Sequence, residues 1–115
     1  MERALPLAVA AIRTATTTPG VKVVFGTDAV AGAHGRNVED LICRVNEAGQ
    51  KPMDAIISAT SLAAQSMRLA DSLGTLRAGY LADVVAVRGN PLADFSAMRR
   101  VVFVMRDGRV HRNTP

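Results

Sequence analysis

Aromatic residues are scarce in this sequence, which has three phenylalanines, one tyrosine and no tryptophan among its 115 residues. Apolar residues still make up 49% of the chain, so a packed core has to be built mainly from aliphatic side chains. No apolar run approaches the roughly 20 residues that a bilayer-spanning helix needs, which argues against a membrane protein. The length suits one compact domain and is too short for two ordinary ones.

Cysteine occurs once, as Cys43, which excludes an internal disulfide and any cysteine-based zinc cluster. Cys43 falls on the apolar face of an expected helix, a position that favours a buried, unreactive thiol over a nucleophile. The N-terminal apolar stretch is a poor secretion signal, because Glu2 precedes it and Arg13 follows it. We therefore expect a cytoplasmic protein.

Acidic residues are rare near the C-terminus, where the whole formal charge of +4 is concentrated. Residues 99–112 contain five arginines against Asp107 alone, whereas the rest of the chain is neutral. Such a cluster can mark a nucleic-acid-binding surface. No aromatic residue for base stacking accompanies it except Phe103, so we favour the solvated faces of a hairpin and expect no nucleic-acid partner.

Apolar residues recur at helical spacing in three segments, residues 3–16, 38–48 and 52–67. Asn37 and Asp40 stand at the positions of a capping box before the second segment. Gly49 is expected to end that helix in a left-handed conformation. The third segment is expected to face inward with a stripe that runs from Met53 to Met67.

Strand patterns lie between and after the helices. The sequence VKVVF at residues 21–25 is short and almost continuously apolar, as is typical of a strand covered on both faces in a parallel α/β sheet. Residues 82–87 predict a further strand, and residues 101–111 predict a hairpin around a type I′ Asp107-Gly108 turn. Because residues 21–25 have no local partner, we expect them to belong to a larger sheet.

Asp28 follows that first strand, with Gly26 between them, at the strand end where parallel α/β folds bind ligands. A carboxylate there can ligate a divalent cation or accept a proton, although the pattern alone favours an ordinary turn. His34, in the glycine-rich loop that follows, can contact substrate or simply be solvated. One aspartate and one histidine cannot complete a catalytic metal site, which takes about three protein ligands.

Five motifs follow one another along the chain: GTDA, a downstream HG, EAGQKPMDAIISAT, LGTLRAGYLADVVAVRGNPLADF and VVFVMRDGRV. In this order they resemble the C-terminal region of amidohydrolase-superfamily enzymes, in particular imidazolonepropionase-like and Xaa-Pro dipeptidase-like members. The resemblance covers about residues 21–110. It implies a (β/α)₈ TIM-like barrel with a small β-sandwich, and hence an α/β chain that is a terminal fragment of such an enzyme.

The resemblance also implies roles for particular residues. Residues 21–25 would be the eighth barrel strand, and Asp28 would be the catalytic residue that ligates the metal and accepts the proton of the attacking water. His34 would contact substrate. Residues 1–75 would form the C-terminal part of the barrel, and residues 76–115 would form the C-terminal part of the sandwich.

Several ligands of the family have no counterpart in this sequence, namely a His-x-His pair, a carboxylated lysine or glutamate, and two later histidines. The resemblance implies that the complete enzyme hydrolyses small amides, cyclic amides or dipeptides with a divalent metal ion. Zinc is the first candidate for that metal. This chain alone is expected to hold no metal and to be inactive. The alternative is a non-catalytic binding or assembly module that completes a partner barrel chain. The expected protein partners are the missing barrel segment or further copies of this chain in a homo-oligomer. A third possibility is a basic protein that binds polyanions through its last hairpin.

Overall fold

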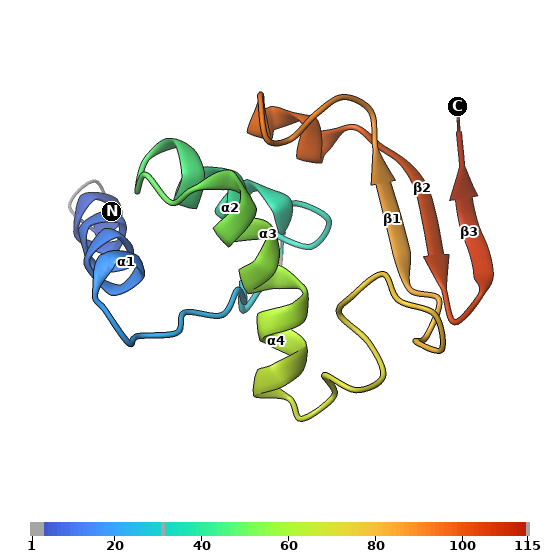
Figure 1. Ribbon diagram of the computed structural model, residues 1–115. Coiled ribbons are helices and arrows are strands. Elements are labelled where there is room, and N and C mark those ends of the chain that lie inside the picture. Colours follow the sequence, from blue (N-terminus) through green and yellow to red (C-terminus); the bar gives the residue numbers. More distant parts are fainter. Residues whose placement is uncertain (1–3, 31, 115) are drawn as a thin grey trace.

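The computed structural model describes residues 4–30 and 32–114. The elements along the chain are α1 (Ala4–Thr17), α2 (Val38–Asn46), α3 (Pro52–Ala59), α4 (Ser61–Ser66), β1 (Val84–Val87), the 3₁₀-helix η1 (Phe95–Arg99), β2 (Val101–Arg106) and β3 (Arg109–Asn113). Figure 1 shows the α-helices on one side of the molecule and the sheet on the other, with η1 beside the end of β1. The α/β composition predicted from the sequence is confirmed at this level.

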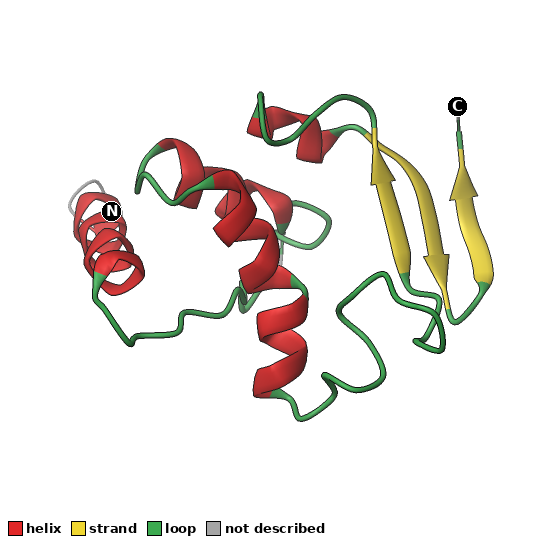
Figure 2. Cartoon of the chain, in the orientation of Figure 1, coloured by secondary structure: helices red, strands yellow, loops and turns green. Residues whose placement is uncertain are grey.

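The three strands form one antiparallel sheet in the order β1-β2-β3, drawn in yellow in Figure 2. Asp107 and Gly108 join β2 to β3 with φ values of 47° and 75°. Positive φ at both central residues defines the type I′ turn, whose twist matches that of the flanking strands. The predicted hairpin is therefore confirmed, with β3 two residues longer than expected.

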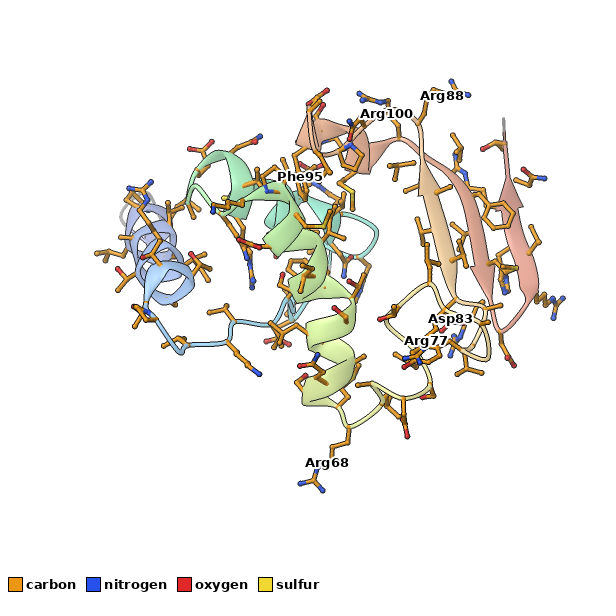
Figure 3. All side chains as sticks on the ribbon, in the orientation of Figure 1. Arg68, Arg77, Asp83, Arg88, Phe95 and Arg100 are labelled. Carbon is orange, nitrogen blue, oxygen red and sulfur yellow. The ribbon has the colours of Figure 1, made fainter. Side chains whose placement is uncertain are left out.

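The core is small and lies where the helices meet η1. It contains Leu41 and Ile42 of α2, Ala55 of α3 and Phe95 of η1, each with at most 4% of its surface exposed. Figure 3 shows Phe95 directed from η1 toward the helices. Phe95 thereby links the C-terminal part of the chain to the helical part, and the apolar stripe predicted for α2 is confirmed.

Helix α1 lies against α2, and Val9 and Ile12 of its expected apolar stripe are half-buried whereas Leu5 is 64% exposed. Leu5, Val9 and Ile12 line an apolar groove of about 210 Å³ between the two helices. Arg13 closes the end of α2, because its Nη2 donates to the Glu47 carbonyl over 2.6 Å. Lysine and arginine side chains are favourable at helix C-termini for this reason. No helix in the described ranges is long and apolar enough to cross a membrane.

The helix predicted over residues 52–67 is divided at Thr60, which has φ −124° and ψ −97°. Met53 and Met67 are about half exposed, and the buried residues of this segment are Ala55, Ser58 and Ala64. The predicted inward face is therefore wrong for Met53, Thr60 and Met67 and correct for Ile56 and Ala64. Small side chains occupy the buried face because the loop around Gly74 approaches it closely. A Cβ on Gly74 would lie 2.6 Å from the Cβ of Ala64.

The capping box predicted at the start of α2 is also wrong. Asn37 makes no side-chain cap and already has a helical backbone, with φ −55° and ψ −34°. A capping residue normally has an extended backbone that directs its side chain to the first amide groups. Asn37 Nδ2 instead donates to Thr27 Oγ1 over 3.0 Å. The residue therefore ties the start of α2 to the loop that carries Asp28.

Residues 21–25 form neither helix nor strand in the structure. A strand requires a hydrogen-bonded ladder to a neighbour, and within residues 4–30 and 32–114 no segment forms a ladder with this one. The strand predicted here is absent for that reason. Its end is nevertheless anchored, because the Phe25 amide donates to the Ser58 carbonyl over 2.9 Å and Arg44 lies 5.1 Å from the centre of the Phe25 ring.

Candidate functional site

Asp28 lies on the loop that leaves residues 21–25, with its side chain exposed. Its φ of 46° is in the left-handed region, which only a few per cent of non-glycine residues adopt. Such a conformation costs on the order of 1 kcal/mol and occurs preferentially at functional sites, where the surrounding structure holds it. Here the Asn37–Thr27 hydrogen bond fixes the residue next to Asp28.

A cavity of about 270 Å³ opens beside Asp28. Its polar lining consists of Thr27, Asp28, Arg36, Asn37, Glu39 and Asp40. We call it the Asp28 cavity. It brings the loop after residues 21–25 together with the first turn of α2, so that three carboxylates and one arginine line the same cavity.

Glu39 is committed to an ion pair on the far side of this cavity. Its carboxylate accepts two hydrogen bonds from Arg99, from Nε over 2.7 Å and from Nη2 over 2.6 Å. These bonds hold the pKa of Glu39 below its usual value, with a smaller contribution from the charge of Arg36. Asp28 and Asp40 are therefore the carboxylates of the cavity that are available to a ligand.

His34 is exposed in the turn that follows and is not among the residues that line the Asp28 cavity. The structure thus places Asp28, Arg36 and Asp40 around one cavity, and the sequence had assigned neither Arg36 nor Asp40 to the site. Asp40 was interpreted as a helix cap, since its spacing from Asn37 fitted one. No local pattern relates Arg36 to Asp28, because their proximity depends on how the loop turns back onto α2.

The described residues do not complete a metal site. Among them, no group of three or more histidine, cysteine, aspartate or glutamate side chains is placed to hold a metal ion. A catalytic zinc typically has three protein ligands. Asp28 can therefore offer one oxygen ligand, and the residues present do not fit a resident metal without further ligands.

Cys43 lines the groove between α1 and α2 and is partly rather than fully buried. Burial raises the pKa of its thiol, and the charges of Glu47 and Asp40 raise it further. A thiol with a raised pKa carries little thiolate at neutral pH and is a poor nucleophile. The prediction of an unreactive thiol therefore has a physical cause in the structure.

Residues 2–111 match the family model described as "Amidohydrolase family", and the chain belongs to this family. It is 36% identical over 97 residues to ochratoxinase from Aspergillus niger, a match that covers 81% of this chain and 20% of that protein. The chain therefore spans about a fifth of the length of the curated relatives it matches. The resemblance stated from the sequence motifs is confirmed.

Solved structures agree with this assignment. A Xaa-Pro dipeptidase with bound methionine in the active site superimposes with a TM-score of 0.87 at 40% identity, over 94% of this chain and 26% of that chain. The crystal structure of A. niger ochratoxinase superimposes with a TM-score of 0.77 at 33% identity, over 91% of this chain and 24% of that chain. The arrangement of helices and sheet described above is therefore shared with hydrolases of this family.

Proposed function

We propose that this chain is the C-terminal portion of a hydrolase that cleaves carbon–nitrogen bonds. In this proposal residues 21–25 are the last strand of a (β/α)₈ barrel, and residues 1–75 are the final part of that barrel. Residues 76–115 belong to a small β-sandwich. The observation that carries the proposal is an apolar, unladdered segment that ends in a left-handed Asp28 beside a polar cavity.

The barrel proposal gives the apolar segment a physical role. A barrel strand is paired on both edges and covered on both faces, which suits a sequence of four apolar residues in five. In the chain as described, the amide groups of Val23 and Val24 lack backbone partners within residues 4–30 and 32–114. Neighbouring barrel strands would supply those partners and bury the exposed Val21 and Val24.

Asp28 has the position and chemistry of a general base at the carboxyl end of this strand. We propose that its carboxylate takes a proton from the attacking water and delivers it to the leaving nitrogen. We propose that the assembled site binds a divalent metal ion, with zinc as the first candidate and Asp28 as one ligand. The other ligands would come from polypeptide beyond the described residues. His34 is proposed to contact substrate from the adjoining loop.

The substrate class is proposed from the relatives, which include an ochratoxinase and a Xaa-Pro dipeptidase. Small amides and dipeptides are therefore the compounds to test. A second candidate function is a non-catalytic module that completes a partner barrel chain.

The test is to combine the chain with a polypeptide that carries the other seven barrel strands of a prolidase-type relative. Hydrolysis of Xaa-Pro dipeptides and N-acyl amino acids is then measured with zinc present. We expect turnover only when both polypeptides are present. Asp28→Asn should lower kcat at least about 100-fold, since general bases contribute about 10²–10⁴. Asp54→Asn, at an exposed position of α3, is the matched control and should leave kcat unchanged.

Two outcomes would contradict the proposal. Turnover by the 115-residue chain alone would show that no further ligands are needed. An assembled, active complex that is unaffected by Asp28→Asn would remove Asp28 from the site and favour the non-catalytic module.

A further inference from the structure

Four arginines converge on a second cavity, away from Asp28. This cavity has a volume of about 340 Å³ and lies between the end of β1, the start of β2 and the end of β3. Its polar lining consists of Arg88, Arg99, Arg100, Arg112 and Thr114. We call it the arginine cavity. Three of its arginines belong to the C-terminal cluster that the sequence placed on solvated faces, so the structure gathers part of that charge in one place.

Arg100 is held in position by the chain around it. Its Nε donates to the Arg88 carbonyl over 3.1 Å, and its Nη2 lies 3.6 Å from Asp94 Oδ2. The guanidinium rests on Gly89, where a Cβ would lie 3.1 Å from Nη2. Figure 3 shows Arg88 and Arg100 as neighbours at the top of the sheet. A fixed guanidinium loses less conformational entropy when it binds an anion.

The charge around the arginine cavity is only partly compensated. Glu39 pairs with Arg99, and Asp94 lies close to Arg100. In residues 4–30 and 32–114, neither Arg88 nor Arg112 has a carboxylate within ion-pair distance. Arg112 Nε instead donates to Thr114 Oγ1 over 3.2 Å, which directs its guanidinium and the hydroxyl toward each other. Counted over the described residues, the cavity therefore has a surplus of about two positive charges.

We propose that the arginine cavity binds the dianionic phosphate group of a small phosphorylated molecule through Arg88, Arg100 and Arg112. The Thr114 hydroxyl accepts from Arg112 and donates to the Val102 carbonyl, and so orients Arg112. Planar guanidinium groups bind phosphate oxygens through paired hydrogen bonds, and two surplus charges match a dianion. No aromatic side chain lines the cavity for base stacking, which favours a small ligand over a nucleic acid. The inference is independent of the proposed hydrolase function.

Inorganic pyrophosphate is the probe, titrated calorimetrically into the 115-residue chain at a constant ionic strength of about 150 mM, where exposed charges are largely screened. We expect saturable binding of one pyrophosphate per chain. The double variant Arg88→Ala/Arg112→Ala should weaken binding at least about tenfold, since charge-assisted hydrogen bonds are lost. Arg109→Ala is the matched control, because it removes one arginine of the same hairpin outside the cavity, and should change the Kd less than about twofold.

A second variant separates charge from geometry. Arg88→Lys/Arg112→Lys retains the charge but loses the planar fork, and should weaken binding less than the alanine variant but more than Arg109→Ala. Circular dichroism should confirm that all variants fold. The proposal fails if pyrophosphate does not bind or if Arg109→Ala weakens binding as much as the double variant. It also fails if duplex DNA displaces the probe with equal dependence on Arg109, which would indicate a general polyanion surface.

Discussion

Gly74 and Gly79 have nearly the same left-handed backbone, with φ of 88° and 86°, but very different surroundings. A Cβ on Gly74 would lie 2.6 Å from the Ala64 side chain and 2.9 Å from the Thr60 carbonyl, whereas a Cβ on Gly79 would meet no atom within 4 Å. We expect Gly74→Ala to cost about 2–4 kcal/mol, because it adds a steric clash to backbone strain. Gly79→Ala should cost only about 1 kcal/mol, from strain alone.

Urea denaturation followed by circular dichroism measures both values. Equal losses for the two variants would contradict the close contact of Gly74 with α4. Gly79→Ala serves as the control, because it changes the same residue type at the same φ. The sequence shows two similar glycines near each other, and only the packing of α4 separates them.

The sequence indicated Asp28 as a candidate site residue, since this carboxylate lies two residues after Gly26 at the end of an apolar run. Its left-handed backbone and the cavity beside it were not predictable, because the cavity is formed by residues of the loop and of α2 that only the fold brings together. His34 was proposed from its place in the glycine-rich loop and from the family resemblance. The structure places it in the adjoining turn but outside the lining of the Asp28 cavity, so its contact with substrate stays a prediction.

Helix α2 and the 3₁₀-helix η1 are far apart in sequence and are joined by Glu39 and Arg99. Because Arg99 lowers the pKa of Glu39 in the folded chain, the ion pair contributes stability above the glutamate pKa of the unfolded chain, about 4.3. That contribution is lost as the pH falls through the lower pKa of the folded state. We expect Glu39→Gln to be less stable than wild type at neutral pH and the difference to shrink below about pH 4.3.

The measurement is the free energy of unfolding of both proteins between neutral pH and pH 3. Glu47→Gln is the matched control, since it removes a carboxylate near the other end of α2 that has no ion pair in the described part of the chain. If the difference in free energy of unfolding between wild type and Glu39→Gln did not depend on pH, the charge of Glu39 would not contribute to stability through this ion pair.

Elements with a strong local code were predicted well. The hairpin depends on an Asp-Gly turn, and α2 depends on an apolar stripe with regular spacing, so both appear where expected. The segment 52–67 was predicted less well. Its break at Thr60 and its buried Ala55 and Ser58 depend on how closely other chain segments approach, and helical periodicity carries no information on that distance.

Much apolar surface of the molecule is exposed within residues 4–30. Leu7, Val21 and Val30, for example, are each at least half exposed. The small core around Phe95 and the Glu39–Arg99 ion pair join the helices to the C-terminal part of the chain. Extensive exposed apolar surface marks a site of contact with other polypeptide. In the proposed barrel, adjoining strands and helices would cover it.

Hydrogen exchange tests this proposal directly. In the chain alone we expect the amides of Val23 and Val24 to exchange rapidly, and the amide of Phe25, bonded to Ser58, to exchange more slowly. When the other seven barrel strands are supplied, Val23 and Val24 should become strongly protected. The amides of β2 are the internal control, because their ladders are present in both states. Unchanged exchange at Val23 and Val24 in the assembled protein would contradict the barrel placement.

The sequence alone determined the family, the positions of α1, α2 and the hairpin, the lack of a local partner for residues 21–25 and the carboxylate that follows them. These features are encoded by local periodicity, turn chemistry and the order of short motifs, all of which involve residues close together in the chain. The tertiary structure alone decided which side chains meet across long separations: Asp28 with Arg36 and Asp40, Glu39 with Arg99, and the arginines of the second cavity. These long-range arrangements depend on how the whole backbone folds, which local sequence patterns do not specify.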